Sequence, residues 1–299
     1  MNVVISCFRG DRHWARTCAA SVRHWHPEAR IFLLKDLSRG DFSTAEMEQA
    51  LGAELFPNPR GSWGWPWSKL AVFFHPQRER FLFLDSDTVL LGRLDGIYQK
   101  KEADFVVTGI RGISPESGTL NRHYLDQQLV RKLDPDYRFP GYAFNGGQMV
   151  ITAGMFRQED FASLVEFGPI PKNRYPEIFK HGDQGILNYF LAKAAAEGRA
   201  RVAYEDFWIW GWDKKKMAEI GVGQLRVGGI PQIAHWAGGD KGSVFHNLVR
   251  KDILDFYEES YYRKVPAGRW KRAMRSAGLG LAARLKKTKR FLIGPSNSN

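Results

Sequence analysis

The chain is 299 residues long, and 43% of its residues are hydrophobic and 25% are charged. This balance is typical of a folded globular protein and excludes a disordered chain, while the lack of any apolar run near ~20 residues excludes a membrane-spanning helix. The net charge of +12 lies mostly at one end, because residues 261–299 contain eleven Lys and Arg and no Asp or Glu. We therefore expect a nearly neutral domain at 1–260 and a basic tail at 261–299.

The N-terminal stretch, MNVVISCFRGDRHW, lacks the basic start and long apolar centre of a signal peptide. The two cysteines, Cys7 and Cys18, offer neither a disulfide framework nor the spacing of metal ligands. We therefore expect a cytoplasmic protein in which both cysteines are small buried side chains.

The first third of the chain alternates apolar runs typical of strands with segments of helical periodicity. We predict strands at 2–8, 30–36 and 80–85, and helices at 12–25, 43–52 and 67–75. Strands that alternate with helices predict an α/β fold with a mostly parallel central sheet and helices on both faces. Ligands of such sheets bind at the carboxyl ends of the strands.

The middle of the chain continues this pattern after one interruption. Strands are predicted at 104–109 and 146–152, and a long helix at 183–197. Between the first two of these elements, the polar segment 111–138 shows no clear periodicity, so we expect a loop or an inserted excursion there.

Two aspartates, Asp85 and Asp87, follow directly on the apolar strand predicted at 80–85. On a straight strand their side chains would point to opposite faces, but a bend past the strand end brings them together. Converged carboxylates repel each other unless a cation lies between them, and oxygen ligands at an open edge suit Mg²⁺ or Mn²⁺. From these residues alone, a solvated turn with two capping aspartates is an equally good interpretation.

The stretch Asp85-Ser86-Asp87 resembles the D-x-D motif of glycosyltransferases with the GT-A fold. Three later segments are similar to motifs of glycosyltransferase family 8, the glycogenin and galactosyltransferase-like group, and occur in the family's order: FNGGQMVIT from Phe144, DQGILN at 183–188 and HWAGGDK at 235–241. The resemblance implies the GT-A fold, a Rossmann-like fold of nucleotide-diphospho-sugar transferases. It also implies a metal-dependent, retaining transfer of a hexose from a nucleotide-diphosphate sugar, expected to be a UDP-sugar, to a hydroxyl of a glycan or glycolipid.

The resemblance assigns the metal and diphosphate contacts to five residues. Asp85, Asp87 and His235 would hold Mn²⁺ or Mg²⁺, and the imidazole favours Mn²⁺. The small Gly238 would let the backbone approach a phosphate, and Lys241 would place its ammonium on the diphosphate. A solvated lysine in a glycine turn is the ordinary alternative for Lys241.

The contacts to the donor sugar are likewise implied by the resemblance. Asn145 and Asp183 would bind sugar hydroxyls, Lys69 would reach a phosphate or the sugar, and Gln184 would lie beside the anomeric carbon. Each position also has a structural alternative: a turn for Asn145, a helix N-cap for Asp183 and a solvated lysine for Lys69.

Some features depart from the family or allow another interpretation. Gly242 and Ser243 stand where the family often has Pro-Trp, and the nucleotide segment is unusual, with Asp11 or Arg12 as candidates for base contacts. The acceptor side has no readable motif, although tryptophans at 63–67 and 208–212 suit either sugar contacts or packing. The alternatives for the whole chain are a haloacid-dehalogenase-type phosphatase with Asp85 as nucleophile, and a non-catalytic, membrane-bound module that binds sugar nucleotides.

The basic tail has an amphipathic pattern. Apolar residues recur at helical spacing between many basic ones: Trp270, Met274, Ala277, Leu281, Leu285 and Leu292. This pattern predicts a helix on an anionic membrane surface, which would place the enzyme on the inner face of the cytoplasmic membrane, where lipid-linked or envelope glycans are built. A solvated, disordered tail is the alternative, and nucleic acid is the least favoured partner.

Overall fold

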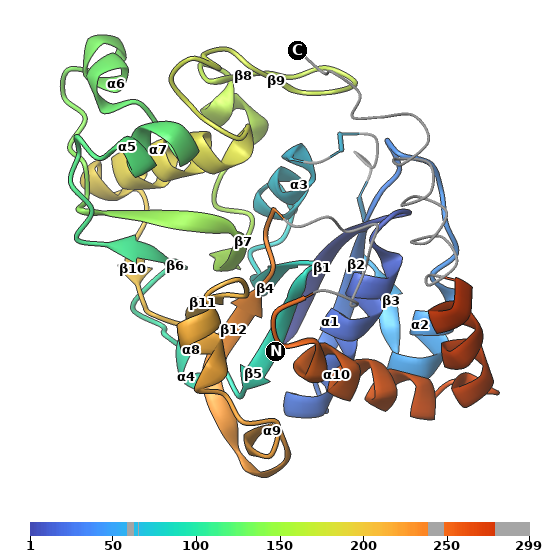
Figure 1. The fold of residues 1–299 in the computed structure, drawn as a ribbon. Helices are drawn as coiled ribbons and strands as arrows, with labels where there is room; N and C mark the ends of the chain where they lie inside the picture. The colour runs from blue at the N-terminus through green and yellow to red at the C-terminus, as the bar shows by residue number, and fades with distance from the viewer. Residues whose placement is uncertain (59–62, 65, 239–247, 279–299) are drawn as a thin grey trace, which may run out of the picture.

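The computed structural model describes residues 1–58, 63, 64, 66–238 and 248–278. Its centre is a seven-stranded sheet of order β10-β6-β7-β4-β1-β2-β3 (Figure 1). The strands are β1 (Asn2–Phe8), β2 (Arg30–Asp36), β3 (Ala53–Leu55), β4 (Arg80–Asp85), β6 (Phe105–Arg111), β7 (Tyr142–Thr152) and β10 (Val202–Tyr204). Only β7 pairs antiparallel with its neighbours, β4 and β6, so the mostly parallel α/β sheet is confirmed.

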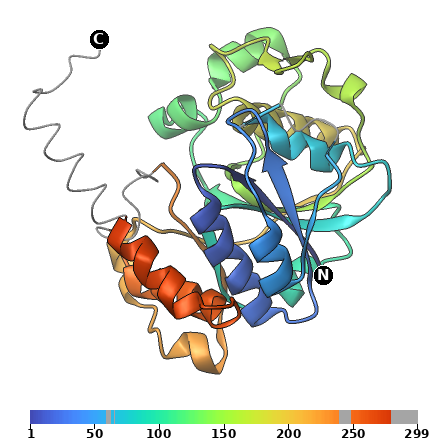
Figure 2. The same cartoon turned by 90° about the vertical axis from the view of Figure 1, so that its right-hand side faces the viewer.

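The sheet has a hydrophobic core on each face, as strand alternation requires. On β1, Val3 and Ile5 pack toward α1 (Arg12–Trp25) and α10 (Lys251–Arg263), whereas Val4 packs toward α3 (Leu70–Phe73) and α7 (Asp183–Ala196). Figure 2 shows α1 and α10 side by side, whereas α7 lies away from both, over another part of the sheet. Each fully buried aliphatic side chain contributes about 1.5–3 kcal/mol.

A second, three-stranded sheet carries one side of the candidate site. It consists of β11 (Trp208–Trp210), β12 (Gly229–His235) and β5 (Thr88–Gly92), with β12 in the middle. Two residues separate the end of β4 from the start of β5, which runs antiparallel to β12 with Thr88 opposite His235. The short turn between β4 and β5 therefore lies directly beside the end of β12.

Several elements have the predicted bounds, including β1, β2, β4 and α1. The helix predicted at 43–52 is α2 (Ala45–Leu51), ended by Gly52 in the left-handed conformation at φ 61°. The helix predicted at 67–75 is a 3₁₀ turn at Trp67–Lys69 continued by α3. Cys7 and Cys18 are free and buried, as predicted.

The polar segment 111–138 is an excursion that contains two short helices, so a plain loop is the wrong interpretation. These are α5 (Gly118–His123) and α6 (Gln127–Leu133). The side chains of Ser117 and Asp126 accept hydrogen bonds from the first backbone N–H groups of the helices. The remaining short elements are α4 (Asp95–Tyr98), β8 (Val165–Glu166), β9 (Lys172–Asn173), α8 (Lys214–Ala218) and α9 (Gln224–Val227).

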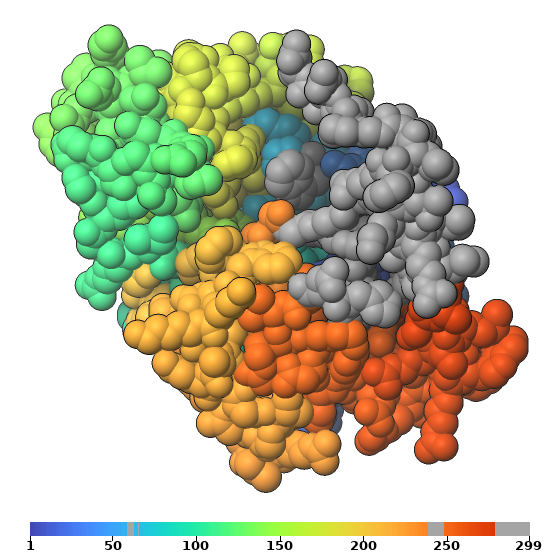
Figure 3. All heavy atoms as spheres, in the orientation of Figure 1, coloured from blue at the N-terminus to red at the C-terminus, as the bar shows by residue number. Residues whose placement is uncertain are grey.

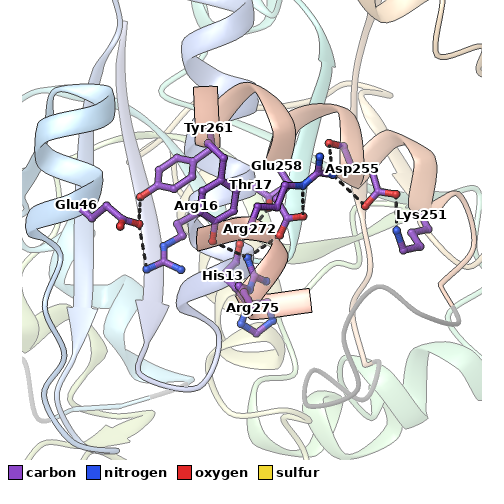
Figure 4. A network of polar contacts seen from close by, with 11 residues as sticks. His13, Arg16, Thr17, Glu46, Lys251, Asp255, Glu258, Tyr261, Arg272 and Arg275 are labelled. Atoms are coloured by element: carbon purple, nitrogen blue, oxygen red, sulfur yellow. Dashed lines mark hydrogen bonds and ion pairs between the residues drawn. The ribbon is translucent and has the colours of Figure 1, made fainter. Parts of the chain in front are cut away.

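The chain after α10 folds back on the body of the protein. Residues 268–278 are helical, and Arg272 and Arg275 both bond to the buried carboxylate of Glu258, at 3.1 and 2.6 Å (Figure 4). Lys271 reaches Glu46 at 2.8 Å. Residue 260, the last residue of the expected domain, lies inside α10, which runs to Arg263. The next two residues, Tyr261 and Tyr262, are buried.

No helix among the described residues is long and apolar enough to cross a membrane. The space-filling view shows a hollow on the face seen in Figure 1. It is bordered by the yellow region of α7 and the orange region of β11 and β12, with blue-green atoms of the first half of the chain at its floor (Figure 3).

Candidate active site

The three predicted metal ligands converge at the turn between β4 and β5. Asp85 ends β4, Asp87 lies in the turn, and His235 ends β12. One ligand atom from each lies within 4.8 Å of the others, and Asp87 and His235 are only 1% and 2% exposed. Nε2 of His235 is 3.2 Å from Oδ1 of Asp87. Three such groups at this spacing suit a divalent cation.

A glutamine on β7 orients the imidazole. Nδ1 of His235 is 2.8 Å from Oε1 of Gln148, which is fully buried. When Nδ1 donates to this oxygen, the lone pair of Nε2 faces Asp87, and two acceptors 3.2 Å apart need a proton or a cation between them. The residues therefore fit a metal. The sequence analysis missed Gln148, although it stands in the segment that resembles the family motif.

An irregularity in β7 brings a glycine pair into the site. Met149 pairs with Val107 of β6, but the next pair is Phe144 with Gly109, so residues 145–148 bulge out of the ladder with β6, while Gln148 still pairs with Leu84 of β4. A Cβ atom on Gly147 would lie 2.3 Å from Cε1 of His235 and 2.7 Å from Oδ2 of Asp85. Only glycine leaves room for the ligand set at this position.

Asn145 supports the same bulge. Its Oδ1 accepts a hydrogen bond of 2.8 Å from the backbone N–H of Gly147. Asn145 lies inside β7, so the turn that was the structural alternative for this residue is not formed. The side-chain amide nitrogen of Asn145 can still donate to a sugar hydroxyl.

Lys69 and Asp183 form a buried ion pair beside this bulge. Nζ of Lys69 is 2.9 Å from Oδ2 of Asp183, and the two residues are 5% and 2% exposed. Nζ also donates to the carbonyl oxygen of Gly146 at 2.7 Å. Lys69 is thus no solvated lysine, and the N-cap interpretation of Asp183 is wrong because α7 begins at Asp183 and Gly182 is its N-cap.

Burial and charge pull the pKa values of this pair in opposite directions. Burial alone would lower the pKa of Lys69, but the carboxylates of Asp183 and Asp85 outweigh it, and the pKa is raised. Burial raises the pKa of Asp183 to about 6, against the pull of Lys69. Lys69 is therefore charged at neutral pH, and Asp183 is the group that titrates.

Two amide side chains of helix α7 form hydrogen bonds with the backbone of β7 at the bulge. Oε1 of Gln184 accepts from the N–H of Gly146 at 3.1 Å, and its Nε2 donates to the carbonyl of His123 at 2.9 Å. Asn188 bonds both backbone groups of Phe144, at 2.8 and 2.9 Å. Gln184 is thus held rigidly in the site. Asn188 is a positioning residue that the sequence analysis did not single out.

The end of β1 forms the other border of the site. The carboxylate of Asp11 accepts from the N–H of Phe8 at 2.8 Å and from the hydroxyl of Ser86. It is 3% exposed. Asp11 therefore supports the turn and is not placed for base recognition. Arg12, the other candidate, lines a pocket with Phe8, Arg9, Gly10 and Arg39.

The last motif is only partly described. Gly238 has a φ of 77°, a conformation that favours glycine, and open space where a side chain would be. Lys241 lies outside the described residues. The tryptophans at 63 and 67 are 6% and 5% exposed, which fits packing rather than sugar contact.

The sequence and structure resemble known glycosyltransferases. The profile of Glycosyl transferase family 8 matches residues 68–200. WbbM, a bifunctional glycosyltransferase, superposes with a TM-score of 0.60 and 16% identity over 91% of this chain and 51% of its own. Galactosyltransferase LgtC, solved with donor and acceptor sugar analogues, superposes with a TM-score of 0.57 and 17% identity. The match covers 87% of this chain and 95% of LgtC. GlyE of Streptococcus pneumoniae TIGR4 superposes with a TM-score of 0.54 and 17% identity, over 86% of this chain and 60% of GlyE.

These likenesses show the GT-A fold. The chain spans about half of the length of WbbM, and no curated protein matches its sequence. The family match covers the segment that contains Asp85, Asp87 and Asp183. The GT-A fold differs from that of a haloacid-dehalogenase-type phosphatase, so the phosphatase interpretation of Asp85 is not supported.

Replacing Gly147 by Ala is expected to abolish Mn²⁺ binding, because the new methyl group would overlap His235 and Asp85. Isothermal titration with Mn²⁺ measures the loss, and circular dichroism checks the fold. Gly168→Ala is the matched control, since nothing lies within 4 Å of its added Cβ. Unchanged Mn²⁺ affinity in a folded Gly147→Ala protein would show that the cation does not bind here.

Replacing Lys69 by Met should destabilise the protein by about 3–5 kcal/mol at pH 8, because Asp183 loses its buried partner. The pKa of Asp183 is already raised to about 6, so stability falls as pH rises through that value. Without Lys69 the pKa rises further, and the loss should be smaller at pH 5, where Asp183 is protonated. Urea unfolding at both pH values measures this difference.

The control for this pair is Lys100→Met. Lys100 lies 2.6 Å from Glu205 at the surface, so its loss should change the stability much less than Lys69→Met does at pH 8, and equally at both pH values. An equal destabilisation by Lys69→Met at pH 5 and pH 8 would contradict the assignment of Asp183 as the titrating group.

Proposed function

We propose that this chain, a glycosyltransferase of the GT-A fold related to family 8, transfers a hexose from a nucleotide-diphosphate sugar, expected to be a UDP-sugar, to a hydroxyl of a glycan or glycolipid. The observation that carries the proposal is the convergence of Asp85, Asp87 and His235 within 4.8 Å. The ion pair of Lys69 and Asp183 lies beside this cluster, across the glycine pair of β7.

The ligand set supports a divalent cation, with Mn²⁺ favoured over Mg²⁺ because one ligand is an imidazole. Bound there, the cation would supply Lewis-acid stabilisation of the charge that builds on the leaving diphosphate. Asp85 and Asp87 would hold it from one strand end, and His235, oriented by Gln148, from another. The buried positive charge of Lys69 lies close to the same place.

Gln184 is the residue we assign to the reacting carbon. One lone pair of its Oε1 is used by the N–H of Gly146, and the second is available to a positively charged sugar. Its amide is held at the other end by the carbonyl of His123, so it needs little reorganisation during the reaction. An amide oxygen is a poor nucleophile, so Gln184 would stabilise an oxocarbenium-like transition state without a covalent step.

The proposal extends to the stereochemistry and to the donor nucleotide. Retention is implied by the family resemblance, with the acceptor hydroxyl attacking from the face of the leaving group and the donor phosphate taking its proton. LgtC, similar to this chain with a TM-score of 0.52 and 16% identity, has been solved as an active-site mutant with glutamate in place of a glutamine. The arginine-lined pocket at the end of β1 supports a nucleotide there, since guanidinium groups donate to carbonyl and phosphate oxygens.

A donor screen tests this function. Nucleotide sugars are added with and without Mn²⁺ while thermal unfolding and release of the nucleotide diphosphate are measured. A true donor at ~100 times its dissociation constant should stabilise the fold by about 2.7 kcal/mol. Asp87→Asn should lose this metal-dependent stabilisation. Gln184→Ala should keep it but lose at least ~100-fold in turnover, since its contact strengthens in the transition state.

Two results would count against the assignment. Full activity in EDTA or in the Asp87→Asn protein would remove the metal site from the reaction. A Gln184→Ala protein with an unchanged turnover and only a raised Michaelis constant would make Gln184 a binding residue.

The C-terminal segment supports a proposal about where the enzyme acts. Two arginines that the sequence pattern assigns to lipid, Arg272 and Arg275, instead bond Glu258 within the protein. The same helix leaves Trp270 and Met274 67% and 55% exposed, on a basic surface. An exposed tryptophan with nearby cations suits the interface of an anionic membrane.

The full chain is expected to sediment with anionic liposomes at low salt, and less so at high salt because exposed charges are screened. Trp270→Ser/Met274→Ser and a chain ended after residue 278 should each bind more weakly. The truncation is placed there because an end at 259 would remove buried residues such as Tyr261. Equal sedimentation of all three proteins would remove the membrane from the proposal.

A further inference from the structure

A groove beside the candidate active site is lined by residues that the proposed chemistry does not use. It lies between the ends of β6 and β10, strand β11 and the start of α8. Its lining residues are Gly109, Ile110, Arg111, Tyr204, Asp206, Trp208, Trp210, Asp213 and Lys216. These segments come from parts of the chain about 100 residues apart, so the groove exists only in the folded protein.

Strand register places the groove next to the reacting groups. Trp210 on β11 is the register partner of His235 on β12, one strand away from a predicted metal ligand. Gly109 on β6 pairs with Phe144 on β7, the residue before Asn145. The groove therefore opens beside the two strands that carry His235 and Asn145.

Two tryptophans give the groove an aromatic face. Trp208 and Trp210 are two positions apart on β11 and share one face of the strand, while Ile209 between them packs into the core. Trp210 is 49% exposed and lines the groove, so part of its ring is accessible there. Tyr204 stands at the same groove, fixed by its hydroxyl, which donates to the carbonyl of Gly109 at 2.8 Å.

Polar groups of balanced charge surround this face. Arg111 and Lys216 are cationic, Asp206 and Asp213 are anionic, and Asp213 is occupied in capping α8. Within the described part of the chain, the indole N–H of Trp208 is buried and has no acceptor. A buried donor left without an acceptor costs about 1–3 kcal/mol, and a ligand hydroxyl in the groove would supply one.

We propose that this groove binds the acceptor as a neutral saccharide, with a sugar ring lying against Trp210 and its hydroxyls reached by Asp206 and the N–H of Trp208. Sugar rings combine an apolar C–H face with a rim of hydroxyl groups. This matches an aromatic wall bordered by a carboxylate, which accepts hydrogen bonds, and an indole N–H, which donates one. The absence of a net charge in the lining disfavours a polyanion. This proposal rests on the proposed transferase function and deepens it, because it names the class of molecule that receives the sugar.

Saturation-transfer NMR tests the groove with the full chain in UDP and Mn²⁺. The probes are the methyl glycosides of galactose, glucose and N-acetylglucosamine, together with lactose, maltose and cellobiose. At least one probe should bind the wild-type protein. Trp210→Ala should weaken that binding at least 10-fold, Trp210→Phe should retain most of it, and Asp206→Asn should weaken it less than Trp210→Ala. Trp270→Ala, an exposed tryptophan on the C-terminal helix, should change nothing.

The proposal and the underlying function fail in different ways. If no probe binds the wild-type chain, if Trp210→Ala binds as well as wild type, or if glucuronic acid binds in preference to the neutral sugars, the groove does not hold a neutral acceptor. In each case the thermal shift of the same protein with UDP and Mn²⁺ stays intact. Loss of that shift in the wild-type chain would instead contradict the proposed function itself.

Discussion

The contact between Asp87 and His235 is the interaction on which the site depends. It exists because β5 leaves the turn after Asp85 and pairs antiparallel with β12, so that Thr88 stands opposite His235. A shift of this register by one residue would turn the imidazole to the other face of its strand. When two carboxylates and an imidazole lie this close, the carboxylates repel each other and the lone pairs of the ligand atoms face one another unless a cation lies between them. Without a cation, the arrangement therefore destabilises the fold.

The same cluster constrains the strand that faces it. Strand β7 must approach His235 and Asp85 closely while also placing Asn145 and the carbonyl of Gly146, and an ordinary ladder with side chains would collide with the ligands. The bulge at 145–148 and the two glycines resolve this conflict. They also create backbone groups that leave the ladder, and Gln184, Asn188 and Lys69 supply partners for them. The bulge of β7 therefore depends on hydrogen bonds from Gln184 and Asn188 of α7.

The protein has two hollows whose chemistry differs. The pocket at the end of β1 is lined by three arginines and suits an anionic nucleotide, whereas the groove at β11 is aromatic with balanced charges. Under the proposed function, the arginine-lined pocket would take the anionic donor and the aromatic groove the hydroxylated acceptor.

The sequence by itself determined the elements whose signals are local. Strands β1, β2 and β4 and helix α1 have the predicted bounds, because apolar periodicity and the flanking turn residues act over a few positions. The motif resemblance likewise indicated the GT-A fold and singled out the cluster of Asp85, Asp87 and His235. By contrast, the two helices in 111–138 were missed, because they are short and capped and lack a strong apolar period.

Only the tertiary structure decided which residues meet. Nothing in the sequence shows that Lys69 is paired with Asp183, more than 100 positions away, or that Gln148 and not solvent holds the imidazole. The pattern of the tail likewise assigned Arg272 to lipid, although a buried glutamate of α10 takes it. These contacts depend on the strand register and on the burial that removes water from each group, and both are properties of the assembled sheet and not of any local stretch of chain.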